Sequence, residues 1–266
     1  MAGVRTWFAA VGVVNAIMGR VEDRQITSGP TFLGDLRDRL LDQVLGLLKA
    51  DPVVNGVALI GSLGHGVADN WSDIDLLILM GDRALARFVT EPTARPWAQA
   101  DLLSDGRHNS PAGATSVGAT HIRSGLPLWI DLHVHPEART RWPTDGRIVF
   151  QRRPIERGTM SFDQLNASGS RQPATAKTAE EIRRIHLSYV PIAGKYIGRR
   201  SPQACEMIRF LGKMPDFSSS DPAAQLLALR GIAGNLADPS WTWLSDAVTA
   251  YLDLVEASLS AWAHRL

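Results

Sequence analysis

The sequence predicts an α+β protein, with a mixed β-sheet flanked by helices in the N-terminal part and an all-helical C-terminal part. Three observations predict this division. Short apolar runs bounded by Gly, Ser and Pro recur before residue 152, as buried strands do. Helical spacing and helix-capping residues dominate after residue 176. Between the two parts, residues 158–176 are rich in Ser, Gly, Ala and Pro, which suggests a linker.

Composition and charge set broad limits on the class of protein. The chain has 266 residues, enough for one large domain or two smaller ones, and its 45% of hydrophobic residues is typical of a globular protein. Lys and Arg number 28 against 27 for Asp and Glu, so no general attraction to nucleic acid or to an acidic membrane is expected. The single cysteine, Cys205, excludes an internal disulfide and a Cys-based zinc site, and it fits a reducing cytoplasm.

An apolar run behind a single Arg lies within residues 4–20. It lacks a convincing small-residue cleavage site, and it is too short to span a bilayer as a helix. We therefore expect a cytoplasmic protein with no membrane partner. For residues 1–30, two interpretations stay open: a helix packed on the body of the protein, or an N-terminal extension.

The elements of the N-terminal part follow in order along the chain. Leucines and valines at helical spacing predict a helix from about Thr31 that Pro52 stops. The runs VNGVALIGS and IDLLILM predict buried strands, and RALARFVTE predicts a short helix. The segment GATSVGATHIRSGLPLWIDLHVHP predicts two strands joined at residues 124–127, and GRIVFQR predicts an edge strand.

Capping residues mark the helices of the C-terminal part. Thr178 and Glu181 form a capping box at the start of AEEIRRIHLSYVPIAGKYIGRR. Further helices are predicted to begin where a capping residue precedes a proline, at Ser201-Pro202, at Asp221-Pro222 and at Asp238-Pro239 or Ser240. We therefore predict one domain over residues 1–160 and a helical domain over residues 175–266.

The segment VALIGSLGHGVADNWSDIDLLILM carries the most chemical information. Gly61 and Ser62 follow the first apolar strand, and Asp73 and Asp75 share one face at the start of the next strand because side chains alternate along a strand. Mg²⁺ is a hard cation that prefers oxygen ligands and substrate phosphates, so two carboxylates on one face suit it. A Gly-Ser turn lets backbone N–H groups approach phosphate oxygens closely. The segment therefore indicates magnesium-dependent phosphoryl chemistry.

Apolar-Gly-Ser, a spacer and then Asp-apolar-Asp-apolar resembles the signature of the DNA polymerase β-like nucleotidyltransferase superfamily. GSLGHGVADNWSDIDLLIL is similar to the aminoglycoside and lincosamide antibiotic nucleotidyltransferases, which also place a helical bundle after a mixed-sheet catalytic domain. The resemblance implies two Mg²⁺ ions held by Asp73 and Asp75, and a triphosphate held by Gly61 and Ser62. It implies transfer of a nucleoside monophosphate, AMP from ATP before other NTPs, to a hydroxyl of a small molecule, with release of pyrophosphate. Neither the P-loop motif nor the dinucleotide fingerprint is present.

The run LPLWIDLHVHP places Asp131, His133 and His135 at alternate positions, hence on one face of a strand. The resemblance implies a third carboxylate on a neighbouring strand, as metal ligand and as general base, and Asp131 stands where it is expected. A buried aspartate is costly unless it is paired or bound to metal. The same run resembles the zinc-binding strand of amidohydrolases, but their (β/α)₈ barrel needs more chain than follows His135. The roles of His133, His135 and His65 stay open.

Lys195 and Arg199 lie one helical turn apart, so they share a helix face. The resemblance implies that they contact the triphosphate, and a solvated basic helix face is the alternative. The acceptor is expected between the sheet and the helical domain, and an aminoglycoside-type acceptor follows from the resemblance alone. Transfer to a protein, as in toxin–antitoxin relatives, and a non-catalytic nucleotide-binding module are the remaining alternatives.

Overall fold

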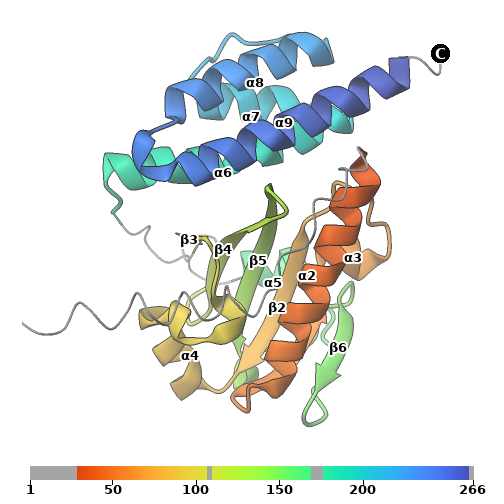
Figure 1. The fold of residues 1–266 in the computed structure, drawn as a ribbon. Helices are drawn as coiled ribbons and strands as arrows, with labels where there is room; N and C mark the ends of the chain where they lie inside the picture. Colours follow the sequence, from red (N-terminus) through yellow and green to blue (C-terminus); the bar gives the residue numbers. More distant parts are fainter. Residues whose placement is uncertain (1–28, 107–109, 169–175, 264–266) are drawn as a thin grey trace, which may run out of the picture.

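A six-stranded mixed sheet forms the centre of the N-terminal part (Figure 1). The computed structural model describes residues 29–106, 110–168 and 176–263. The strand order is β3-β4-β5-β2-β1-β6, in which the central pair β2 and β5 is parallel and the other neighbours are antiparallel. The strands are β1 (Val54–Leu59), β2 (Ile74–Met80), β3 (Leu102–Asp105), β4 (Thr115–Arg123), β5 (Leu126–Pro136) and β6 (Arg147–Gln151).

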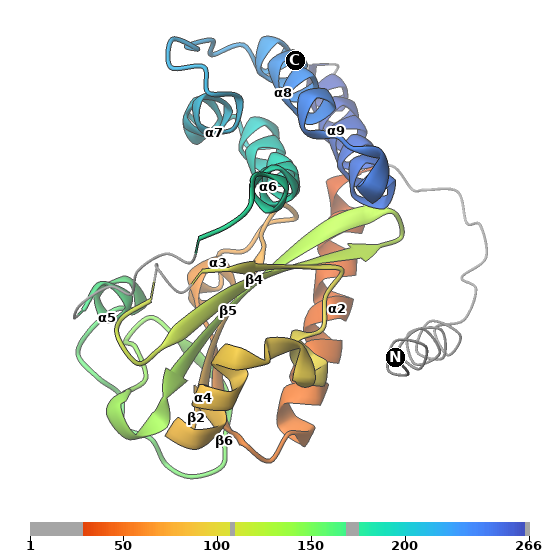
Figure 2. The same cartoon turned by 90° about the vertical axis from the view of Figure 1, so that its left-hand side faces the viewer.

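The two faces of the sheet are covered differently. On one face, α2 (Pro30–Ala50) and α4 (Asp82–Thr90) contribute their buried apolar residues to the main core (Figures 1 and 2). On the other face a smaller apolar cluster forms around Trp142 and around Phe162 of α5 (Phe162–Ala167). Odd-numbered positions of β2 and β5 point to this second face, because Leu77 and Leu79 belong to its cluster. The second face therefore receives the aspartates of both strands.

After α5, the described chain continues with the helices α6 (Ala179–Gly198), α7 (Gln203–Gly212), α8 (Pro222–Leu236) and α9 (Thr242–Ala263). They pack on one another above one end of the sheet, and α9 also contacts β5 and α2 (Figure 1). Gly198 of α6 lies directly on Trp71, since a Cβ at this glycine would be 2.8 Å from Trp71 Cζ2. The loop that leads into β2 is therefore in close contact with the helical region.

The predicted fold class is confirmed, since a mixed sheet flanked by helices precedes a helical region. The predicted helix stopped by Pro52, the strands β1, β2, β5 and β6, and the short helix α4 are all present. The capping box of Thr178 and Glu181 is present, and the Asp221 side chain accepts hydrogen bonds from the N–H groups of the first turn of α8. The division at residues 160 and 175 remains a prediction.

Several expectations about element boundaries were wrong. The predicted linker contains α5, whose capping box joins Ser161 to Gln164. The turn between β4 and β5 is limited to Ser124 and Gly125, whose φ angles are 50° and 77°, because two left-handed residues suffice for a tight hairpin. Pro202 is the N-cap of α7 rather than its first helical residue.

Other short elements were not predicted. These are β3, the five-residue helix α3 (Gly61–His65) and the 3₁₀ helices η1 (Pro92–Ala94), η2 (Pro96–Ala98), η4 (Glu137–Arg139) and η5 (Pro239–Trp241). Asp238 caps η5, and α9 starts only after it. Such elements span too few residues for a helical or strand period to register in the sequence.

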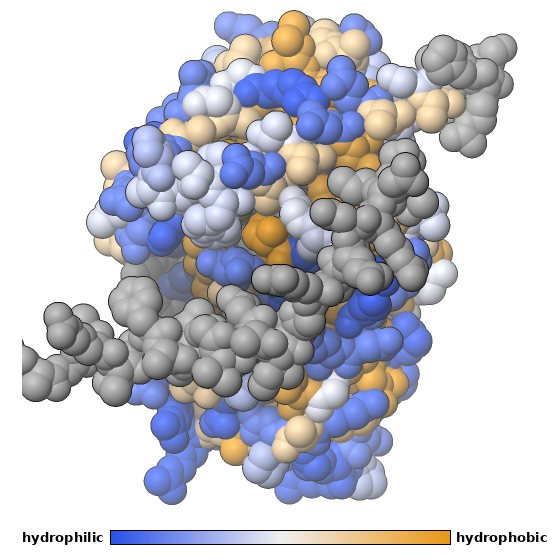
Figure 3. Space-filling view, in the orientation of Figure 1, coloured by the Kyte–Doolittle hydropathy of each residue, from blue (hydrophilic) through white to orange (hydrophobic). Residues whose placement is uncertain are grey.

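The expectations for residues 1–28, including the apolar run, lie outside the described residues. Within the described ranges, no helix is long and apolar enough to cross a membrane. Hydrophilic and hydrophobic residues are interleaved on the face seen in Figure 3. Large exposed apolar side chains such as Phe210 and Leu227 are distributed over several helices.

Candidate active site

Two aspartates lie side by side at the centre of the sheet. Asp75 of β2 and Asp131 of β5 are register partners on the parallel strand pair, and both point to the second face. Asp73 stands one residue before β2, and alternation puts it at the same side of the sheet. Three predicted site residues are thus brought together from two separate parts of the chain.

Burial and mutual repulsion control the charge on these carboxylates. Burial, together with the nearby charges of Asp73 and Asp131, raises the pKa of Asp75 to about 8, although the ammonium of Lys195 opposes the shift. Burial also raises the pKa of Asp131 to about 6, although a hydrogen bond from Trp129 opposes the shift. The site therefore holds more negative charge than its surroundings stabilise, which is the condition a bound cation would relieve.

Gly61 allows the first turn of α3 to lie against Asp75. Its φ is +59°, and a Cβ at this position would overlap the Asp75 side-chain oxygen Oδ2. Gly61 and Ser62 begin α3, and the N–H groups of the first turn of a helix have no hydrogen-bond acceptor within that helix. The predicted Gly-Ser turn is therefore the start of a short helix that adjoins the carboxylates.

Lys195 of α6 contributes a cation to the same site. Its Nζ donates to Asp73 Oδ2, and its side chain is 9% exposed. The hypothesis of a solvated basic helix face is therefore wrong for Lys195. Any contact of this ammonium with a triphosphate remains a prediction, since in the structure the ammonium is paired with Asp73.

Arg199 binds the loop before β2 rather than projecting into solvent. Its Nε and Nη2 donate to the two carboxylate oxygens of Asp69 at 2.8 and 2.5 Å, and Nη2 also donates to Ser72 Oγ at 3.1 Å. Burial alone would raise the pKa of Asp69, but hydrogen bonds from Arg199 and Ser72 lower it to about 2. Arg37 of α2 donates to the Asp69 carbonyl oxygen at 2.5 Å. The loop that ends at Asp73 is therefore held from both α2 and α6.

Sequence reasoning missed two residues that contact the predicted site. One is Asp69, which connects Arg37 and Arg199 to the loop before β2. The other is Trp129, whose indole N–H donates to Asp131 Oδ1 at 2.8 Å. Strand alternation does place Trp129 on the face of Asp131 two residues later, so this contact had a detectable sequence pattern.

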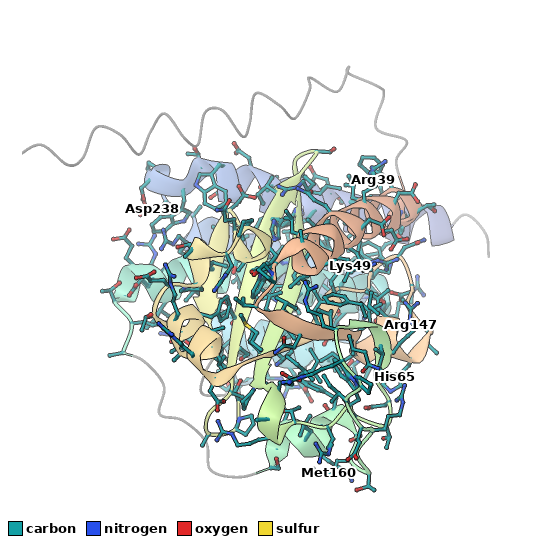
Figure 4. All side chains as sticks on the ribbon, turned by 90° about the horizontal axis from the view of Figure 1, so that it is seen from below. Arg39, Lys49, His65, Arg147, Met160 and Asp238 are labelled. Atoms are coloured by element: carbon teal, nitrogen blue, oxygen red, sulfur yellow. The ribbon has the colours of Figure 1, made fainter. Side chains whose placement is uncertain are left out.

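The three histidines left open by the sequence differ in their surroundings. His65 Nδ1 lies 2.7 Å from the Gly61 carbonyl oxygen, and its Nε2 lies 3.5 Å from Asp145 Oδ2. His65 is found on the side of the molecule that carries Arg147 and Met160 (Figure 4), and it lines a cavity of about 160 Å³. The cavity is lined by Ile60, Gly61, His65, Asp75, Asp145, Phe162 and Asp163.

His133 and His135 are buried below Asp131 on the same face. Burial lowers the pKa of His133 to about 3 and that of His135 to about 4, so both rings are neutral near pH 7. The His133 ring packs edge-on against Phe162, with ring centroids 4.8 Å apart. The sheet is open and mixed rather than a closed parallel barrel, which excludes the amidohydrolase fold.

The donor chemistry of the site suits Mg²⁺, because its ligands would be carboxylate oxygens that repel one another. Among the described residues, no group of three or more His, Cys, Asp and Glu side chains is already arranged to hold a metal ion. Asp73 instead takes the ammonium of Lys195 as its partner. The residues fit the cation in kind, and a metal that bound Asp73 Oδ2 would compete with the Lys195 ammonium.

Comparisons with known proteins are sparse. No protein-family model and no curated protein matches the chain. Among solved structures, it is similar to a STING-associated CdnE c-di-GMP synthase from Capnocytophaga granulosa, at 12% sequence identity over 89% of this chain and 83% of that chain. The TM-score of 0.32 is too low for this likeness to carry an argument about activity or acceptor.

Proposed function

We propose that the protein is a magnesium-dependent nucleotidyltransferase that moves a nucleoside monophosphate from an NTP, ATP before others, to a hydroxyl of a small molecule and releases pyrophosphate. One observation carries the proposal. Asp75 and Asp131 are register partners on adjacent parallel strands, with Asp73 at the strand start and Gly61 against Asp75. This arrangement supports the function that the Gly-Ser and Asp-Ile-Asp segments suggested from the sequence.

Each residue of the site has a role in this proposal. Asp73, Asp75 and Asp131 would hold two Mg²⁺ ions, which polarise the phosphate and lower the pKa of the attacking hydroxyl. Asp131 would also act as the general base that accepts the proton of the acceptor hydroxyl, because it lies in register beside Asp75 at the centre of the site.

Lys195 and the start of α3 would serve the phosphates. The Lys195 ammonium lies at the carboxylates, where it would neutralise negative charge that develops on pyrophosphate. The N–H groups of Gly61 and Ser62 lie in the first turn of α3 and so lack intrahelical partners, and Gly61 itself lies against Asp75. Arg199 would act through the loop before β2, because its guanidinium is bound to Asp69.

The acceptor site lies, in this proposal, between the sheet and the helical region, and an aminoglycoside-type acceptor rests on the sequence resemblance alone. Nucleic acid and membrane are not proposed as partners, because the chain has nearly equal numbers of acidic and basic residues. A cytoplasmic location is proposed on the use of a single cysteine.

The test is transfer of label from α-labelled ATP, with pyrophosphate release measured in parallel, in the presence of Mg²⁺ and a panel of aminoglycosides, lincosamides and proteins. We expect turnover with a small hydroxylated acceptor that is lost in Asp73→Ala and Asp75→Ala. Asp42→Ala is the matched control, because Asp42 lies on an exposed position of α2. Turnover that survives in both site variants would overturn the proposal. Label transferred to a protein would correct the acceptor, and tight ATP binding without Mg²⁺ or turnover would instead indicate a binding module.

A further inference from the structure

The indole N–H of Trp129 donates a hydrogen bond to one of the two carboxylate oxygens of Asp131. Both residues belong to β5 and share a face because they are two positions apart. Trp129 Nε1 donates to Asp131 Oδ1 at 2.8 Å. This bond leaves Oδ2 as the oxygen of Asp131 that is not engaged by the indole.

A glycine on the neighbouring strand makes room for the indole. Gly118 of β4 is the register partner of Asp131, and a Cβ there would lie 2.5 Å from Trp129 Cζ2 and 2.6 Å from Ser104 Oγ. A larger residue at position 118 would push the ring away from the sheet. The position of the indole is therefore tied to the strand beside Asp131.

Helix α6 also contacts the indole. Tyr189 packs edge-on against Trp129, with ring centroids 5.2 Å apart and an interplanar angle of 66°. The ring is thus packed against both β4 and α6, and these two contacts restrict the direction of its N–H. Aromatic pairs in this geometry stabilise their arrangement beyond the area that they bury.

We propose that Trp129 is a positioning residue, which fixes the orientation of Asp131 so that Oδ2 faces the cation and the acceptor hydroxyl. This inference rests on the proposed function, in which Asp131 is a metal ligand. Hydrogen bonds to ligating carboxylates orient them, and losing such a partner weakens metal affinity or activity by roughly 10- to 100-fold. Trp129 would act only through Asp131.

The test compares Mn²⁺ binding by the full chain and by its variants, measured by calorimetry and by electron paramagnetic resonance. Trp129→Phe keeps an aromatic ring and removes the N–H, so we expect Mn²⁺ affinity to fall by roughly 10- to 100-fold. The chain offers a matched control in Trp97, whose Nε1 donates to Asp51 Oδ2 at 2.9 Å. Trp97→Phe removes the same kind of hydrogen bond outside the carboxylate site and should leave Mn²⁺ affinity unchanged.

Gly118→Ala provides a second variant, which keeps the N–H and displaces the ring. We expect it to weaken Mn²⁺ binding as Trp129→Phe does, and to lower kcat with little change in KM for the NTP. If Trp129→Phe and Gly118→Ala bind Mn²⁺ as tightly as the control Trp97→Phe does, the positioning role is overturned while the metal site stands. A wild-type chain that binds no Mn²⁺ would overturn the metal site, and the role of Trp129 with it.

Discussion

Replacing Lys195 by Met tests the ion pair that this side chain makes with Asp73. Met keeps most of the buried aliphatic stem and removes the ammonium that pairs with Asp73. Removing one partner of a fully buried ion pair costs about 3–5 kcal/mol of stability. Asp73 keeps 24% of its side chain exposed, so solvent screens its charge. We therefore expect a loss of about 2 kcal/mol in the free energy of unfolding without divalent cations.

Added Mg²⁺ should reverse most of this loss, because in the variant the cation meets carboxylates with no ammonium to displace. A ligand that binds only the folded state at 100 times its Kd stabilises it by about 2.7 kcal/mol. The assay is urea denaturation with and without Mg²⁺, with Lys49→Met on the exposed end of α2 as control. We expect a larger Mg²⁺-dependent gain in Lys195→Met than in the wild type. Equal gains would refute the reasoning that Lys195 and the metal compete for Asp73.

Three further outcomes are expected. The folded-state pKa of Asp75 is raised to about 8, so protonation of this carboxyl stabilises the folded state. In metal-free protein, this contribution to the free energy of unfolding should be complete below about pH 4 and should be lost as the pH rises through about 8. Urea midpoints measured against pH should show this fall, and its absence in metal-free protein would contradict the burial of Asp75. Gly61→Ala should lower both thermal stability and turnover more than Gly66→Ala, since both have positive φ but only a Cβ at 61 meets Asp75. A similar loss in the two alanine variants would show that backbone strain alone matters. Asp69→Asn should lower the free energy of unfolding, measured by urea denaturation, by about 1–3 kcal/mol and should lower turnover, because it weakens the charged hydrogen bonds from Arg199. The control Asp253→Asn, at an exposed ion pair with Arg230, should cost less than about 1 kcal/mol. Equal effects of the two substitutions would show that Asp69 does not hold the loop before β2.

The elements that sequence reasoning recovered are those with a long local pattern. The leucines of α2 repeat at helical spacing along this 21-residue helix, and β2 is apolar apart from Asp75 and is followed by a glycine. The helix α5 was missed because the Ser, Gly and Asn residues around it favour loops, while Phe162 and Leu165 pack it against the apolar cluster on the second face of the sheet. A six-residue segment held by tertiary packing has no periodicity to detect.

The candidate site was predictable to the same extent. Asp73 and Asp75 were chosen from their alternation at the start of a strand, and Asp131 because the resemblance implied a third carboxylate on a neighbouring strand; the structure brings them together. Arg199 was predicted as a site residue because it shares a helix face with Lys195. A shared face does not identify the partner of the guanidinium, and the structure pairs Arg199 with Asp69. Asp69 itself stood in a loop whose shape no local rule fixes.

The sequence by itself determined which residues share a face, because the periods of strands and helices are local properties of the backbone. Only the tertiary structure decided that β5 lies parallel beside β2 with Asp131 in register with Asp75, and that Lys195 reaches Asp73 across 122 residues of chain. Strand partners and register are selected by which apolar faces can be buried together, and that choice depends on the whole chain at once. The identity of the site residues was therefore local information, whereas their assembly into one charged site required the fold.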